Sequence, residues 1–373
     1  MNQCQVAVVF RTYAQEKATR FLCQALNDDK RFGKTKRFDL QAWKDADALC
    51  RALAVHDVIV FSCGGRDLNA LLDRVRRKAD RIKAVALFPG IVMDSQLDAF
   101  ITRAGCDIVL LNSEMDAGIY RRVCHALGLQ NNGIVYGAAW LEAHAGGQVD
   151  NSSAKDVVGI LPSTAFFEQL YVPCRRKERQ RLAQDLILIA ERNPHRMFLI
   201  KGRSAEPGSR QVPEALCRII ADIGKPVNMS FTEAPVNSVL EIVDSCLSIS
   251  SSAAIEALLL RKNVYLLSGY ASEGSHDQYF QDSGLIVQAE QVDFMRPPAA
   301  CSRWLRENVQ HPAFGLETVK HRLMQPKNEL RVLPARCSIT KLALAFPAVF
   351  LRHPLKSLRV VGRSFAITGM NHG

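Results

Sequence analysis

Three consecutive serines stand at a strand-to-helix junction in the stretch SISSSAAIEALLLRKNVYLLSGY, residues 248–270. The first N–H groups of a helix have no partner inside the helix, and the helix dipole favours negative charge there. We therefore expect Ser250, Ser251 and Ser252, together with those amides, to bind one phosphate group without a metal ion. A single serine at such a position has a simpler role as a helix cap, which is worth about 1 kcal/mol.

Further polar residues are expected around the same phosphate. Glu256 lies one turn along the helix, where its carboxylate could accept hydrogen bonds from the two hydroxyls of a ribose; its alternative role is to favour the helix start. Lys201 and Arg203 follow the strand-like run in FLIKGRS and could neutralise a phosphate or a sugar carboxylate. Solvated loop charges are the alternative for these two cations. Tyr270 closes the strand-like run after the serine helix, and we include it in the predicted nucleotide site.

Four residues are candidates for acid–base catalysis. Asp67, Asp94 and Glu114 each stand near the end of a predicted strand, where one of them could deprotonate an acceptor hydroxyl as general base. His276 lies in the loop after the strand that follows the serine helix. A helix cap or a solvated acid is the alternative for each carboxylate, and an ordinary surface residue is the alternative for the histidine. The histidines show no H-x-x-x-H grouping, so we expect no catalytic metal.

The composition is that of a folded, two-domain protein in a reducing compartment. The chain has 373 residues, of which 48% are hydrophobic and 23% are charged, and a chain of this length usually forms two domains. Its 11 cysteines lie mostly in apolar runs and include no C-x-x-C pair. The start MNQCQVAVVF is unlike a signal peptide, and no run is long and apolar enough to span a bilayer. We expect a cytoplasmic protein.

The net charge is +11, but its distribution argues against a nucleic-acid partner. From residue 331 to the end there is no acidic residue, while Arg and Lys are interleaved with Leu, Val, Ala and Phe. Such a segment suits the surface of an anionic membrane; a basic helix packed on the protein itself is the alternative. Aromatic residues make up only 7% of the chain, too few for a base-stacking surface.

Short apolar runs alternate with amphipathic helical patterns in two parts of the chain. Residues 1–140 and 156–330 each show this alternation, which is typical of a parallel sheet with helices on both faces. Residues 141–155 are rich in small and polar residues and form the predicted linker. The predicted fold is therefore α/β, with two Rossmann-like domains facing a cleft and a basic amphipathic segment at 331–373. Ligands of open α/β sheets bind at the carboxyl ends of the strands.

The assembled segments resemble a family of bacterial glycosyltransferases of GT-B type, distantly similar to capsule Kdo transferases and bacterial sialyltransferases that use CMP-sugars. The matching pieces cover most of residues 1–290; they are FPGIVM, RAGCDIVLLNSE, LGLQNNGIVYG, VPCRRKERQRLA, NPHRMFLIKGRS, the serine stretch and YFQDSGL. The resemblance implies that the second domain holds a nucleotide-sugar donor, with Ser251 and Ser252 on the phosphate and Glu256 near the nucleoside. The first domain would bind the acceptor.

The resemblance further implies a metal-independent enzyme that moves a sugar, such as Kdo or sialic acid, from a CMP-activated donor to a glycan or glycolipid of the capsule or lipopolysaccharide. No cofactor is expected beyond that donor. The basic segment would keep the enzyme beside a lipid-linked acceptor, at the inner face of the cytoplasmic membrane. The sialyltransferase-like enzymes carry a His-Pro pair where this chain has Lys201-Gly202-Arg203, which leaves the nucleotide and the leaving-group acid open.

Two alternatives of other classes also stay open. The first is a UDP-sugar-dependent glycosyltransferase or a non-hydrolysing sugar-nucleotide epimerase, which would share the two-domain plan. The second is a nucleotide- or polyanion-binding protein that is not an enzyme.

Overall fold

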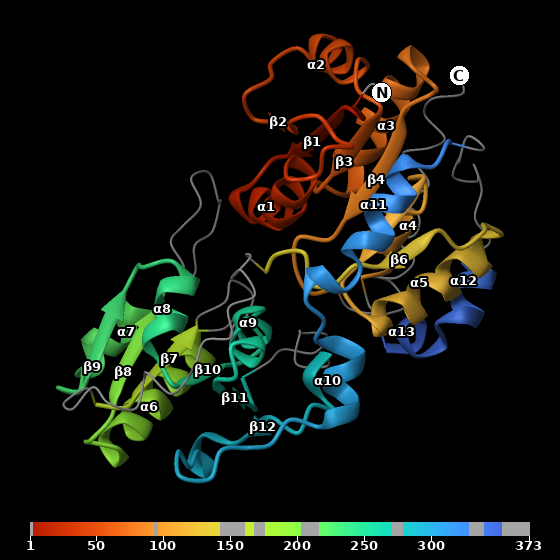
Figure 1. The fold of residues 1–373 in the computed structure, drawn as a ribbon. Helices are drawn as coiled ribbons and strands as arrows, with labels where there is room; N and C mark the ends of the chain where they lie inside the picture. Colours follow the sequence, from red (N-terminus) through yellow and green to blue (C-terminus); the bar gives the residue numbers. More distant parts are fainter. Residues whose placement is uncertain are drawn as a thin grey trace. The chain divides into compact units, whose positions relative to one another are not determined.

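The computed structural model describes residues 3–92, 96–141, 161–167, 176–202, 216–270, 279–327 and 339–352, and it shows two α/β units (Figure 1). The first unit comprises residues 1–145 and 306–373, and the second comprises residues 146–305. Each unit is built on a parallel sheet, so the predicted pair of Rossmann-like domains is confirmed. The predicted end of the second domain at residue 330 differs from the observed division, because the chain returns to the first unit after residue 305.

The first unit is a six-stranded parallel sheet with its helices. Its elements are β1 (Val6–Phe10), α1 (Tyr13–Asn27), β2 (Lys36–Asp39), α2 (Ala46–Leu53), β3 (Val58–Phe61), α3 (Gly65–Lys78), β4 (Lys83–Leu87), α4 (Leu97–Arg103), β5 (Ile108–Leu111), α5 (Glu114–Leu127), β6 (Gly133–Val135), and later η3 (Pro312–Phe314), α11 (Leu316–Met324), α12 (Ile339–Ala345) and α13 (Pro347–Arg352). The strand order is β2-β1-β3-β4-β5-β6. Strands β1, β3, β4 and β5 are buried along their whole length, as central strands covered on both faces must be.

The second unit repeats this plan. Its elements are β7 (Ser163–Phe167), α6 (Arg176–Arg192), β8 (Met197–Lys201), α7 (Leu216–Ile223), β9 (Met229–Thr232), α8 (Val236–Ile242), β10 (Ser245–Ser248), α9 (Ala253–Leu259), β11 (Asn263–Leu267), β12 (Ile286–Val287) and η2 (Ala289–Gln291), followed by α10 (Ser302–Asn308), which crosses the division. The strand order is β12-β11-β10-β7-β8-β9. The order reverses between β7 and β10, as it does between β1 and β3 in the first sheet, and such switch points are where open α/β sheets bind ligands.

The returning segment, residues 306–327, is tied to the first unit by hydrogen bonds. The N–H of Gly315 donates to Tyr136 O at 3.2 Å. Lys83, at the start of β4, donates from Nζ to the carbonyls of Arg322 (3.0 Å) and Leu323 (2.7 Å), which lie in the last turn of α11. A cation there satisfies carbonyls that have no partner inside the helix and complements the helix dipole.

Helices α12 and α13 pack on the first unit rather than standing free. Leu342, Phe346 and Val349 are buried in the same hydrophobic cluster as the first sheet, and α12 contacts α5 (Figure 1). Leu344 and Leu351 remain 76% and 82% exposed. For residues 339–352 the structure therefore agrees with the alternative interpretation of the basic segment, a helix packed on the protein itself. Within the described ranges, no helix combines the length and the apolar character needed to cross a bilayer.

Candidate functional site

Four strand ends of the second sheet form one row at its carboxyl edge. Ser248 of β10 pairs with Phe167 of β7, Phe167 pairs with Lys201 of β8, and Lys201 pairs with Thr232 of β9. Ser248 and Lys201 are thus two strands apart, a separation of about 10 Å. The prediction that Lys201 and the serines lie at the same edge is confirmed by this register. Lys201 is half-buried, and its Nζ donates to the carbonyl of Gly202 at 2.9 Å.

The serine turn, residues 250–252, is held by local hydrogen bonds. The N–H of Ser251 donates to Oγ of Ser248 at 3.1 Å. The amides of residues 253–256 also have partners: Ala253 donates to Ser251 Oγ (3.2 Å), Ala254 to Ser251 O (3.0 Å), Ile255 to Ser252 O (3.0 Å) and Glu256 to Ser252 O (3.3 Å). The expectation that the first amides of this helix are unpartnered is therefore wrong for residues 253–256. Short-range bonds thus join the turn to the first residues of α9.

Ser252 is the member of the turn that is left available to a ligand. It is half-buried, it takes the N-cap position of α9 with helical φ and ψ of −60° and −21°, and its hydroxyl makes no capping bond. Among the described residues, none accepts from or donates to this hydroxyl. Ser250, by contrast, is only 3% exposed. A phosphate at this turn would therefore bind chiefly through Ser252 and the hydroxyl hydrogen of Ser251.

Glu256 lies in α9 with its side chain buried. The residue is 6% exposed. Burial raises the pKa of the Cys246 thiol on β10, and the charge of Glu256 raises that pKa further, so this carboxylate lies close to β10. Glu256 thus lies in the helix that follows the serine turn, on the side that faces β10.

Tyr270 does not offer its hydroxyl to a ligand. It is 1% exposed, its hydroxyl donates to Asp185 of α6, and the guanidinium carbon of Arg181 lies 5.5 Å from the centre of its ring. Burial, followed by the bond to Asp185, raises the pKa of Tyr270 well above its usual range. Tyr270 therefore packs against α6 and helps to hold this helix in place. The predicted residues Arg203 and His276 lie outside the described residues.

The predicted acids of the first unit stand at the carboxyl edge of its sheet. Asp67, in the first turn of α3, makes an ion pair with Arg11, which follows β1; Arg11 Nη2 and Asp67 Oδ1 are 3.1 Å apart. This ion pair spans the switch point between β1 and β3. Glu114, in the first turn of α5, is exposed. Asp94 lies outside the described residues.

A third acid, Asp116, has the most perturbed environment at this edge, and the sequence analysis did not select it. It is 1% exposed, and burial raises its pKa to about 7, although hydrogen bonds from Asn112 lower it. Asn112 N–H donates to Asp116 Oδ2 at 3.3 Å, and Asn112 Nδ2 donates to the carbonyl of Gly90 at 3.1 Å. Among the described residues, Asp116 Oδ1 has no partner. Perturbed acids of this kind are enriched at functional sites.

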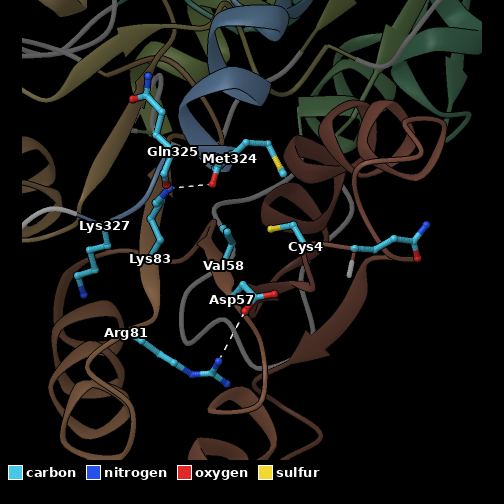
Figure 2. Close-up of a pocket in the computed structure, with 10 residues that line it drawn as sticks. Cys4, Asp57, Val58, Arg81, Lys83, Met324, Gln325 and Lys327 are labelled. Atoms are coloured by element: carbon cyan, nitrogen blue, oxygen red, sulfur yellow. Dashed lines mark hydrogen bonds and ion pairs between the residues drawn. The ribbon is translucent and has the colours of Figure 1, made fainter. Parts of the chain in front are cut away.

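A pocket of about 350 Å³ lies at the opposite, amino edge of the first sheet (Figure 2). Cys4, Val58 and Lys83 line it, together with Met324 and Gln325 of the returning segment. Its most buried cation, Lys83, already donates to the end of α11. The pocket therefore belongs to the attachment of the returning segment, at the edge of the first sheet opposite to Asp67 and Glu114. In the part of the chain that the structure describes, no three His, Cys, Asp or Glu side chains gather as metal ligands would.

A family model described as "Putative glycosyltransferase (DUF6716)" matches residues 5–325 of this chain. The chain belongs to this family. The match confirms the glycosyltransferase part of the predicted resemblance, and it says nothing of Kdo transferases or sialyltransferases. A search of curated protein sequences found no match.

Solved structures similar to this member of the glycosyltransferase family include two UDP-GlcNAc 2-epimerases. The enzyme from Methanocaldococcus jannaschii has a TM-score of 0.59 and 10% identity, covering 86% of this chain and 100% of that chain. The enzyme from Neisseria meningitidis, bound to UDP-GlcNAc, has a TM-score of 0.55 and 12% identity, covering 86% of this chain and 99% of that chain. At such identity the likeness establishes the two-domain fold alone.

Proposed function

We propose that this protein transfers a sugar from a nucleotide-sugar donor to a hydroxyl of a glycan or glycolipid acceptor, and that its second unit holds the donor. The observation that carries this proposal is the serine turn. Among the residues that the structure describes, none bonds to the hydroxyl of Ser252, and its turn follows Ser248, which lies in the same row of strand ends as Lys201. Family membership supports the transferase reaction.

The proposed chemistry needs no metal ion. Ser251 and Ser252 would donate hydrogen bonds to the phosphate that leaves with the nucleotide, and Lys201 would offset its charge. Fixed donors of this kind stabilise charge that develops in the transition state. Glu256 would accept hydrogen bonds from the ribose. A carboxylate of the first unit, Asp67 or Glu114, would take the proton of the acceptor hydroxyl.

Asp94 and His276 stay candidates for the acid–base roles, and Arg203 stays a candidate for the phosphate, on the sequence argument alone. The choice of nucleotide also rests on likeness. The resemblance to sialyltransferase-like enzymes favours CMP. The similar solved structures are named UDP-GlcNAc 2-epimerases, and this favours UDP as the nucleotide. A UDP-sugar transferase or an epimerase is therefore the second candidate.

A titration calorimetry panel with CMP, UDP and GDP tests the proposal and separates the candidates. Tight binding of CMP supports a CMP-sugar donor, and tight binding of UDP supports a UDP-sugar. In the second case, NMR of UDP-GlcNAc incubated with the protein and no acceptor distinguishes the two reactions, since only an epimerase converts the sugar by itself. Binding of none of the three nucleotides, with salt-sensitive binding of single-stranded RNA, would contradict the proposal.

We place the acceptor on a lipid, at the inner face of the cytoplasmic membrane. The support is the absence of acidic residues from 331 to 373, together with the exposed side chains of Leu344 and Leu351. Cosedimentation with vesicles tests it: the protein should bind vesicles of anionic lipid and not those of neutral lipid, and Leu351→Asp should weaken binding. Equal recovery with both lipids would contradict it.

A further inference from the structure

A buried arginine in the first unit makes no ion pair with any residue that the structure describes. Arg103, the last residue of α4, is 5% exposed. Its Nε donates to the carbonyl of Leu87 at 3.0 Å, and its Nη1 donates to the carbonyl of Ala99 at 3.0 Å. The guanidinium carbon lies 4.3 Å from the centre of the Phe88 ring. Among the described residues, no carboxylate makes an ion pair with Arg103, and none accepts a hydrogen bond from its Nη2.

The charge of Arg103 persists at neutral pH. Burial lowers its pKa to about 10, which still leaves the guanidinium protonated. The carboxylate of Asp98, in the first turn of α4, acts on this charge, but Asp98 is exposed to solvent and makes no ion pair with Arg103. Cys63 and Cys106 do not balance the charge, because burial raises the pKa of each thiol to about 12 and keeps it neutral. A buried cation that makes no ion pair is unfavourable in a folded protein. A bound anion would remove that cost.

The guanidinium lies against a glycine turn that could complete an anion site. A Cβ atom built on Gly64 would lie 2.7 Å from Arg103 Nη2 and 2.8 Å from Nη1, so the two terminal nitrogens pack directly on this residue. Gly64 is the N-cap of α3, a 14-residue helix whose start makes no side-chain capping bond. Gly65 follows with a φ of +61°, and nothing lies within 4 Å of a Cβ built there. Helix starts and turns that combine these features bind anions.

We infer that Arg103 and the glycine turn, Gly64 and Gly65, bind an oxyanion, a phosphate or carboxylate group carried by the acceptor. This inference rests on the proposed function, because it gives the acceptor of the first unit a negative group. The site lies at the carboxyl edge of the first sheet, after β3 and beside the switch point. The nearby carboxylate of Asp67 is ion-paired with Arg11, whose positive charge offsets its repulsion of the ligand.

Inorganic phosphate and acetate are the probes for this site, each titrated by calorimetry into protein that is saturated with the nucleotide it binds best, so that the serine turn is filled. We expect Arg103→Met to weaken binding of the preferred anion by at least about tenfold, the usual loss for a hydrogen bond to a charged group. The control is Arg76→Met, which removes a partly buried arginine of the first unit, one that is ion-paired with Asp107 at 3.1 Å. It should leave the affinity unchanged.

Unchanged affinity in Arg103→Met, or an equal loss in both variants, would overturn the inference. If Arg103→Met does not fold, NMR of the arginine side chains in the wild-type protein decides: the Arg103 signal should shift on addition of the anion, and a signal that does not move would overturn it. The nucleotide titration of the same samples separates the two proposals. Protein that binds no nucleotide while its Arg103 signal moves with phosphate would refute the donor site and leave this site standing.

Discussion

Oγ of Ser248 accepts the N–H of Ser251 at 3.1 Å, so the last residue of β10 fixes the turn that follows it. Ser248 is fully buried and also donates to the carbonyl of Phe167 at 3.3 Å. It therefore links the turn to both strands at the switch point of the second sheet. Because Ser248 is buried, its contribution to ligand binding acts through the position of Ser251 and Ser252.

Ser248→Ala is expected to weaken nucleotide binding by about two- to tenfold, since it removes one hydrogen bond that orders the turn. Titration calorimetry measures this loss. Ser245→Ala is the matched control, because Ser245 is equally buried in the same strand but stands at its amino end. An equal loss of affinity in both variants would show that β10 matters only for folding.

Glu256→Gln is expected to lower the affinity for the nucleotide by about tenfold or more, and to leave the affinity for inorganic phosphate unchanged. The reason is that the carboxylate is assigned to the ribose hydroxyls, which inorganic phosphate lacks. Both affinities are measured by calorimetry. Glu241→Gln, an exposed acid of α8, is the control. A parallel loss for phosphate and nucleotide would contradict the assignment.

Asp116→Asn is expected to change how stability depends on pH. The pKa of Asp116 rises from 3.8 to about 7 on folding, so between these values the folded state binds more protons than the unfolded state. The wild-type protein should therefore lose free energy of unfolding, relative to Asp116→Asn, as the pH rises from about 4 to about 7. The loss is at most about 4 kcal/mol.

Urea unfolding at a series of pH values measures this difference. Glu114→Gln is the control, because Glu114 occupies the same helical turn but is exposed. If the difference in free energy of unfolding between wild type and Asp116→Asn stays constant across this pH range, Asp116 is ionised in the folded protein.

Phe346→Ala is expected to lower the free energy of unfolding by about 3–5 kcal/mol, because it opens a cavity between the C-terminal helices and the first unit. Leu344→Ala, which changes an exposed leucine of α12, should have almost no effect. Chemical denaturation measures both. Two similar small losses would show that α12 and α13 do not pack on this core.

The apolar runs predict most strands because the central strands of a parallel sheet are apolar on both faces. The edge strand β2 is not predicted in this way, because it has no apolar run. Its Lys36 and Arg37 are exposed and only Phe38 is buried, since it pairs with β1 alone. The sequence also does not say which unit α11 joins, because an amphipathic helix shows that one face is buried but not against what.

The candidate site was predictable in part. The serines, Glu256 and Lys201 could be grouped because they all follow or adjoin the ends of predicted parallel strands. The hydrogen bonds of the amides 253–256 could not be predicted, because they depend on the backbone angles of the turn. Asp116 did carry a signal: it precedes the buried residues Ile119 and Tyr120 by three and four positions, and helical periodicity places it on their face.

The most direct test of the account is the nucleotide affinity of Ser252→Ala, measured by calorimetry beside Ser163→Ala, which changes a serine at the amino edge of the same sheet. The account predicts a loss of about tenfold or more for Ser252→Ala, because a donor to the phosphate disappears, and no change for Ser163→Ala. Wild-type affinity in Ser252→Ala would contradict the assignment of the serine turn as the phosphate site.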